Sequence, residues 1–235
     1  TDPRLDVSTG RFETPFLDWT VPNALDGWVR DVSNGGLYLN KKNIPRKADK
    51  GSLSNTTQTN STAKNFHLIR YADVLLWYAE TLIELGQPQQ AGEYINQVRA
   101  RAANSYVKAV DPATMTEASS TYVLDDKING KQSTDAAANY RIGLYPPSQF
   151  ASKDKALEAL RWERRLELAM ESQRFFDLVR WGIADSVINT FYKEEAPKRT
   201  YYEDAHFEKN RAEYVPIPQQ QINFSKQVYK QNYGY

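Results

Sequence analysis

Two neighbouring stretches with helical apolar spacing constrain this fold more than any other feature of the chain. The first covers residues 65–85 and ends at Gly86, with Pro88 just beyond, a combination that stops helices. The second covers residues 89–103. We therefore predict two antiparallel helices joined by a short loop. The apolar positions that define them are Leu68, Ala72, Leu75, Leu76, Ala79, Leu82 and Ile83, followed by Ala91, Tyr94, Ile95, Val98 and Ala102.

The predicted hairpin, residues 65–104, resembles one tetratricopeptide-type (TPR-like) unit. A second copy at a period of about 34 residues is not found, so the sequence does not predict a solenoid.

The remaining segments divide into loops and one more helical region. Residues 1–64 carry scattered prolines and no sustained helical period, which indicates a loop-rich but structured segment. Loops are also expected over 105–151. Residues 152–187 predict two helical stretches. The first is capped by Ser152 and runs to Glu171. The second runs from Arg174 to Val187 and is either continuous with the first or interrupted near Gly182. The tail, 188–235, reads as extended. The expected class is mainly α with little β.

Composition excludes several kinds of chemistry. The chain has 30 Lys and Arg against 29 Asp and Glu, which predicts no nucleic-acid partner. It has no cysteine, so disulfides, thiolate metal sites and cysteine nucleophiles are excluded within this stretch. The two histidines, His67 and His206, lack metal-binding spacing, and no catalytic or cofactor motif is present. We expect no metal, no cofactor and no catalytic residue.

The strongest catalytic candidate is a set of acids at helical spacing, Glu163, Glu167 and Glu171. Two such carboxylates could serve as the acid and base of a glycosidase. Interleaved Arg164, Arg174 and Arg180 would instead hold them ionised. The sequence favours a structural ion-pair network between helices. A calcium loop at Asp125 is ruled out by its ligand positions, so an ordinary turn is expected there.

Aromatic residues are in excess for a hydrophilic chain, with 15 Tyr, 9 Phe and 5 Trp at a mean hydropathy of -0.69. Trp19 and Trp28 lie in loop sequence beside acids, amides and Arg. A sugar ring stacks its C–H face on such a ring and hydrogen-bonds to the polar neighbours. The alternative is that each Trp fills the core beneath a loop.

Four motifs in order resemble the SusD/RagB family of Bacteroidetes surface lipoproteins. They cover nearly the whole chain, with one departure at Ser172, where the family usually has glycine. The motifs are Asp2–Leu5 with Gly10-Arg11 and Leu17-Asp18-Trp19, Arg70–Glu80 with Asn96–Ala102, Glu163–Glu171 with Arg174–Gly182, and Pro216-Ile217-Pro218 with Gln231–Tyr235.

The resemblance implies a SusD-like irregular helical fold and a non-enzymatic role. Family members capture oligosaccharides or polysaccharides at the outer-membrane surface and cap a TonB-dependent transporter of the SusC type. It also implies that 1–235 is the C-terminal part of one domain, partnered by an N-terminal half of the same protein that would carry the lipid anchor.

Ligand contacts in the family tend to come from loops, including the segment that opens this chain. We therefore predict a glycan site built on Trp19 and Trp28, with Asp18, Asn23, Asp26, Arg30 and Tyr38 as polar or stacking partners. The alternative is a protein interaction module that docks the transporter without binding glycan, its aromatic residues serving as interface anchors or core.

Overall fold

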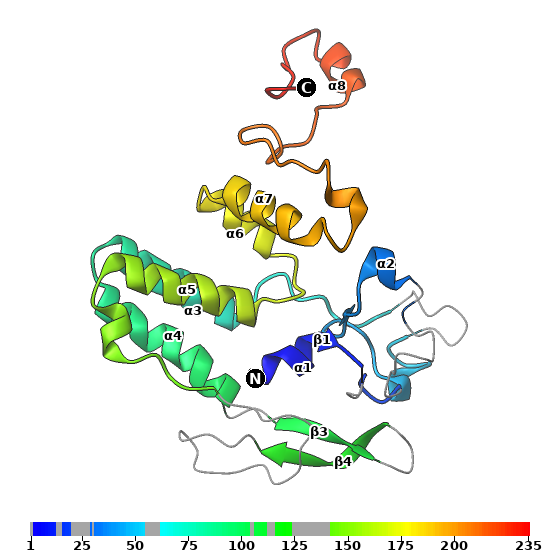
Figure 1. Ribbon diagram of the computed structural model, residues 1–235, viewed down its shortest axis with the longest axis vertical. Helices are drawn as coiled ribbons and strands as arrows, with labels where there is room; N and C mark the ends of the chain where they lie inside the picture. The colour runs from blue at the N-terminus through cyan, green and yellow to red at the C-terminus, as the bar shows by residue number, and fades with distance from the viewer. Residues whose placement is uncertain are drawn as a thin grey trace. The chain divides into compact units, whose positions relative to one another are not determined.

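The computed structural model describes residues 2–12, 16–19, 29, 31–54, 62–103, 106–111, 116–123 and 142–235. The chain divides into two compact units, Thr1–Glu171 and Ser172–Tyr235, and each is described by itself. Unit 1 contains α1 to α5 and both small sheets, whereas unit 2 contains α6 to α8 (Figure 1). The described chain is mainly helical, as predicted.

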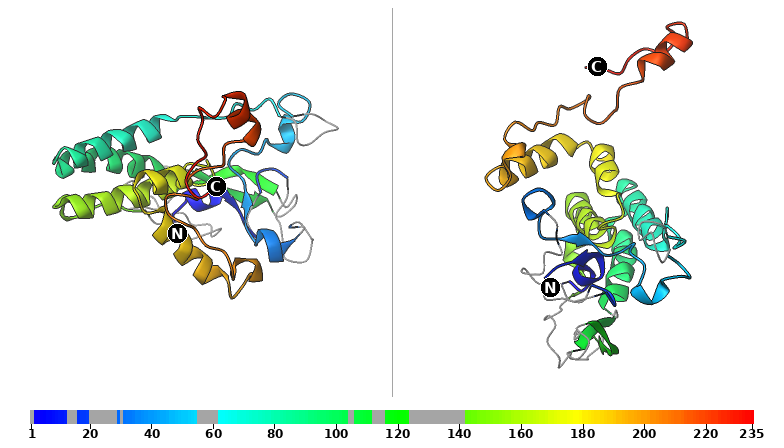
Figure 2. Two further views of the ribbon diagram at one scale, coloured as in Figure 1. Left: turned by 90° about the horizontal axis from the view of Figure 1, so that it is seen from above. Right: turned by 90° about the vertical axis from the view of Figure 1, so that its right-hand side faces the viewer.

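The centre of unit 1 is a bundle of α3 (Tyr71–Glu84), α4 (Pro88–Ala103) and α5 (Lys153–Glu167), which run side by side in both figures (Figures 1 and 2). The predicted α3–α4 hairpin is confirmed. Gly86 makes its turn with φ +79°, a left-handed conformation that favours glycine. The buried side chains of the bundle include Leu76, Ile83, Ile95, Phe150 and Leu160.

The start of the first helix was predicted too early. Residues 65–70 are not helical, and Arg70 is the extended N-cap of α3. The apolar residues of this stretch do not join the core, since Phe66, Leu68 and Ile69 are all exposed. Leu68 fits the helical spacing in sequence only.

Short strands flank the bundle. β1 (Thr9–Gly10) follows α1 (Arg4–Ser8) and pairs antiparallel with β2 (Leu39–Asn40). Between them lies the short helix α2 (Val32–Gly35), and the 3₁₀ turns η1 (Lys47–Asp49) and η2 (Pro147–Phe150) complete unit 1.

The second sheet corrects the expectation of loops throughout 105–151. β3 (Tyr106–Asp111) and β4 (Thr116–Val123) pair antiparallel, with Tyr106 opposite Val123. The β4 sequence is rich in Ser and Thr and has no apolar alternation, so periodicity gave no signal for this strand.

The end of α5 also differs from prediction. Ser152 is the N-cap as expected, and its hydroxyl accepts a hydrogen bond from the Lys155 backbone at 3.4 Å. The helix ends at Glu167 instead of Glu171. Met170 and Ser172 then adopt φ values of +64° and +63°. These left-handed residues interrupt the helix where the sequence still has helical spacing.

Unit 2 begins with α6 (Arg174–Arg180) and α7 (Ala184–Glu195). Of the two alternatives that the sequence left open, the structure shows the interruption near Gly182, which has φ +68°. Leu178, Ala184 and Phe207 form the core of the unit.

The tail expected to be extended contains helical turns. α7 continues to Glu195, and η3 (Thr200–Tyr202) and α8 (Gln219–Phe224) follow. Gln231 joins the two parts of the C-terminal motif, because its side-chain amide hydrogen-bonds both the N–H and the carbonyl of Ile217, at 2.8 and 2.9 Å. No helix in the described part of the chain is long and apolar enough to cross a membrane.

Candidate functional site

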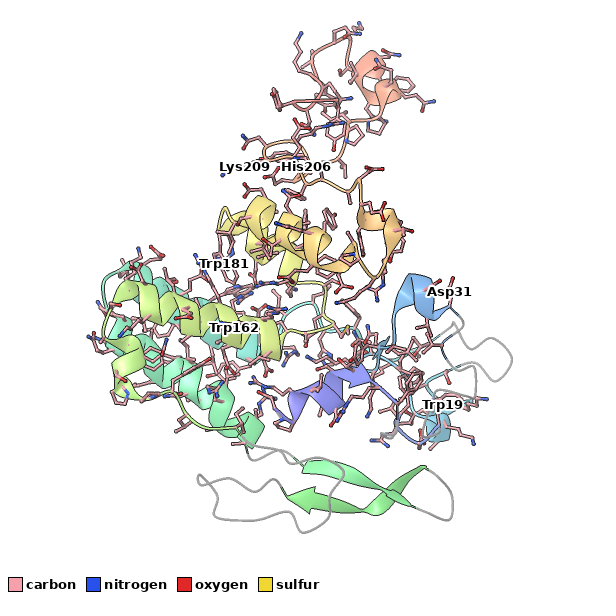
Figure 3. All side chains as sticks on the ribbon, viewed as in Figure 1. Trp19, Asp31, Trp162, Trp181, His206 and Lys209 are labelled. Carbon is pink, nitrogen blue, oxygen red and sulfur yellow. The ribbon has the colours of Figure 1, made fainter. Side chains whose placement is uncertain are left out.

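The loop that holds Asp18 and Trp19 is fixed against the η1 turn. The Asp18 carboxylate accepts hydrogen bonds from the backbone N–H groups of Lys47 and Ala48, at 2.6 and 2.9 Å. The Trp19 indole Nε1–H donates to the carbonyl of Pro45 at 2.9 Å. These bonds join segments almost thirty residues apart and orient the indole ring (Figure 3).

The surroundings of Trp19 are apolar on the inside and charged on the outside. Phe16 is buried beneath the loop and packs so closely on Gly10 that a Cβ there would lie 2.4 Å from the Phe16 ring. The Lys50 ammonium lies 5.1 Å from the centre of the Trp19 ring, within cation–π range. Trp19 itself is half-buried. The ring is thus anchored at one end and partly open to solvent.

Asp18 is ionised in this loop. Partial burial raises the pKa of its carboxyl, but the backbone N–H groups of Ala48 and Lys47 lower it by more, so that the pKa lies below its ordinary value. Asp18 therefore supplies negative charge beside Trp19, although both of its carboxylate oxygens already accept hydrogen bonds from backbone N–H groups.

The structure brings Asp18 and Trp19 together among the residues predicted to bind ligand. Tyr38 is exposed and immediately precedes β2. Asn23, Asp26, Trp28 and Arg30 lie outside the described residues. Lys50 and Pro45 were missed, because no local motif connects them to a tryptophan so distant in sequence.

Glu163 and Glu167 of α5, together with Glu171 just beyond its end, form an ionic network. Glu163 pairs with Arg4 and Arg99, at 2.6 and 2.9 Å. Glu167 pairs with Arg4, Arg70 and Arg101. Glu171 pairs with Arg70 and Lys42, and Lys42 also donates to the carbonyls of Glu167 and Ala169 at the end of the helix. The network ties α5 to α1, to α4, to the segment that follows β2 and to the residue that precedes α3.

The predicted network of ion pairs between helices is confirmed, including pairs that join the segment 70–80 to the segment 163–182. The cations that pair with Glu163, Glu167 and Glu171 are not the interleaved arginines that the sequence suggested. Arg164 pairs with Asp73 at 2.8 Å, and Arg180 pairs with Asp177 in unit 2. Side chains three or four residues apart can meet on one helix face. Glu163 and Glu167 instead face inward and meet cations from other elements. The sequence predicted pairing between helices, but it did not identify these cations.

The electrostatics of the network oppose acid catalysis. Burial raises the pKa of Glu167, but hydrogen bonds and charges from Arg101 and Arg70 lower it by more. The pKa of Glu167 therefore lies below its ordinary value. A general acid of a glycosidase needs a raised pKa. Each carboxylate of Glu163, Glu167, Glu171 and Asp177 has a cationic partner.

No group of three or more His, Asp or Glu side chains that could hold a metal ion occurs within the described ranges.

A family model settles the resemblance noted in the sequence. The model of the SusD family matches residues 1–235. The chain belongs to the SusD family. A SusD-like protein, P38, from Formosa agariphila is 32% identical over 124 residues, which are 53% of this chain and 18% of that protein.

Two solved structures share the fold of this SusD-family chain. A SusD homolog from Bacteroides thetaiotaomicron matches with a TM-score of 0.64 at 23% identity, and a SusD superfamily protein from Bacteroides vulgatus with 0.55 at 21%. All of this chain is covered, together with 41% and 40% of those chains. The chain thus spans about two fifths of the length of these structures.

Proposed function

We propose that this SusD-family chain binds glycan without cleaving it and that the loop of Trp19 contributes to the binding surface. The observation that carries the proposal is the anchored, partly open indole ring of Trp19, with charged groups of both signs nearby. The apolar face of a sugar ring stacks on such an indole, while its hydroxyls reach polar neighbours.

The absence of bond cleavage is part of the proposal. It is supported by the ion pairs and the lowered pKa in the α5 network, because carboxylates held in this way do not supply the proton that a glycosidic leaving group needs.

Family membership supports the wider role. We propose that the protein acts at the outer-membrane surface and delivers oligosaccharide to a SusC-like transporter.

Calorimetric titration against a panel of polysaccharides tests the site. Trp19→Ala removes the stacking surface, and we expect binding to weaken about tenfold, since an aromatic contact contributes about 1 kcal/mol or more. Trp162→Ala is the matched control. Trp162 is an exposed tryptophan on α5 that also has a cation over its ring, Arg165 at 5.1 Å (Figure 3). We expect this control to leave binding unchanged.

A second variant separates stacking from loop anchoring. Trp19→Phe keeps an aromatic face but removes the indole donor to Pro45. We expect it to bind more tightly than Trp19→Ala. Wild-type affinity in Trp19→Ala, with its far-UV circular dichroism unchanged, would refute the assignment of the site.

One observation favours the alternative of a protein interaction module. Phe66, Leu68, Ile69 and Tyr71 form a nearly continuous exposed apolar run, with Leu68 76% exposed. Exposed apolar patches mark protein interfaces. Co-purification with a transporter that is lost in Leu68→Asp, together with no glycan binding by the wild-type chain, would support this second function over the first.

A further inference from the structure

Unit 2 contains a cavity remote in sequence from the loop of Trp19. Its volume is about 490 Å³, within the range of about 300–1,000 Å³ typical of small-molecule sites. It lies between the end of α7, η3 and the segment that follows, where Figure 3 labels His206. The residues that line it and bear on the argument are Tyr192, Lys193, Pro197, Tyr202, Glu203 and His206.

The apolar part of the cavity is an aromatic wall. The rings of Tyr192 and Tyr202 stack with centroids 5.3 Å apart and planes at 23°. Tyr202 also contacts Phe191 and Tyr201 edge-on or tilted, at 5.6 and 4.4 Å. Each ring is thus held by its neighbours. Pro197 adds a further apolar surface.

Hydrogen bonds hold the two sides of the cavity in place. The Asn189 amide on α7 donates to the Phe207 carbonyl at 3.0 Å and accepts from the Phe207 N–H at 2.8 Å, which ties the segment of His206 to the helix. Glu195 pairs with Lys198 and Arg199, at 2.8 and 2.6 Å, across the turn that contains Pro197. The cavity is therefore formed before any ligand arrives, which lowers the entropic cost of binding.

The rim carries three polar side chains of different kinds. Lys193, Glu203 and His206 are exposed, and none of them makes an ion pair or side-chain hydrogen bond with another described residue. The Lys193 ammonium donates hydrogen bonds, the Glu203 side chain offers two oxygen acceptors, and the two ring nitrogens of His206 can take part as donor or acceptor. The opposite charges of Lys193 and Glu203 leave no net charge at the rim that would select an anionic or a cationic ligand. A neutral ligand with many hydroxyl groups suits all three, because each hydroxyl both donates and accepts.

We propose that this cavity is a second glycan subsite, which takes a neutral pyranose ring against Tyr192 and Tyr202 with its hydroxyls toward the rim. The ligand class is that of the proposed function, and the inference rests on it in that respect. The site itself uses no residue of the Trp19 loop.

The composition of the chain provides a local probe. Its only histidines are His67, exposed in unit 1, and His206 at the cavity. We would titrate the 235-residue chain with the methyl glycosides of glucose, galactose, mannose and xylose and follow the two imidazole resonances by NMR, assigned with His67→Gln. The inference predicts that one or more glycosides shift the His206 signal saturably at millimolar concentration and leave that of His67 in place.

Variants test the contacts. Tyr202→Ala should weaken the His206 response about tenfold, as should Lys193→Met, a change at an exposed rim position that we expect the fold to tolerate. Tyr229→Ala, an exposed tyrosine of the tail outside the cavity lining, should not. A His206 signal that no glycoside moves, or that moves as much in Tyr202→Ala and Lys193→Met as in the wild-type chain, would overturn the inference.

The Trp19 indole N–H signal, assigned with Trp19→Phe, reports the first site in the same titration. Movement of the Trp19 signal alone would refute the second subsite and leave the proposed function standing. Movement of the His206 signal alone would support the second subsite and refute the assignment of the first.

Discussion

Removing one buried carboxylate from the α5 network should cost much of the stability of unit 1. Glu163 has a fully buried side chain, 0% exposed, and joins Arg4 of α1 to Arg99 of α4. Glu163→Gln keeps the size and one acceptor but removes the charge. Two guanidinium groups with only 8% and 13% of their side chains exposed then lose their shared counter-ion.

The magnitude follows from what each arginine retains. Breaking a buried pair costs about 3–5 kcal/mol. Arg4 keeps Asp2 and Glu167, and Arg99 keeps the Gly143 carbonyl, so we expect the low end, about 3 kcal/mol. With a urea slope of about 2 kcal/mol per M, the unfolding midpoint should fall by about 1.5 M.

The assay is urea unfolding followed by far-UV circular dichroism, with Glu84→Gln as the matched control. Glu84 makes its pair with Lys153 at 2.5 Å, but the side chains are 54% and 50% exposed. Such pairs contribute about 0–1 kcal/mol. If Glu163→Gln lowers the midpoint no more than Glu84→Gln does, then burial does not make this network stabilising and the reasoning is wrong.

Three further predictions concern the backbone, the core and pH. Ser172→Gly should stabilise the chain by about 1 kcal/mol in urea unfolding, because the left-handed φ of +63° costs a side chain about that much; Ser172→Ala should give no such gain. Gly92→Ala should destabilise by about 1–3 kcal/mol, because the new Cβ would lie 2.6 Å from the Phe150 ring, whereas Gly143→Ala meets no atom within 4 Å and should be tolerated; equal thermal midpoints would contradict this. The lowered pKa of Glu167 stabilises the folded chain above the ordinary pKa of 4.5, and this stability is lost as pH falls through the pKa of the folded state. The urea midpoint should therefore drop between about pH 6 and pH 3, and the drop should be smaller in Glu167→Gln.

Local patterns predicted the helices well where packing and sequence agree. The turn at Gly86, the N-cap at Ser152 and the break at Gly182 each depend on one residue's conformational or hydrogen-bonding preference, which the sequence shows directly. The start of α3 and the end of α5 depend on contacts across the fold. Leu68 has helical spacing in the sequence but is exposed and does not pack in the core. The left-handed residues after Glu167 end a helix that the apolar spacing alone would continue.

The candidate site was only partly predictable for the same reason. Tryptophan in polar loop sequence pointed to Trp19, but its partners Pro45 and Lys50 depend on how the η1 turn folds back. No sequence pattern indicated the cavity in unit 2 either. Tyr192 and Tyr202 belong to a tail that was expected to be extended, and their stacking depends on α7 continuing to Glu195.

The most direct test of the central claim, glycan binding without cleavage, is a calorimetric titration of the wild-type chain with a panel of polysaccharides and recovery of the glycan afterwards. We expect saturable binding to at least one glycan, weakened about tenfold by Trp19→Ala, with the glycan recovered at its original length. No saturable binding to any glycan, or release of shortened products, would contradict it.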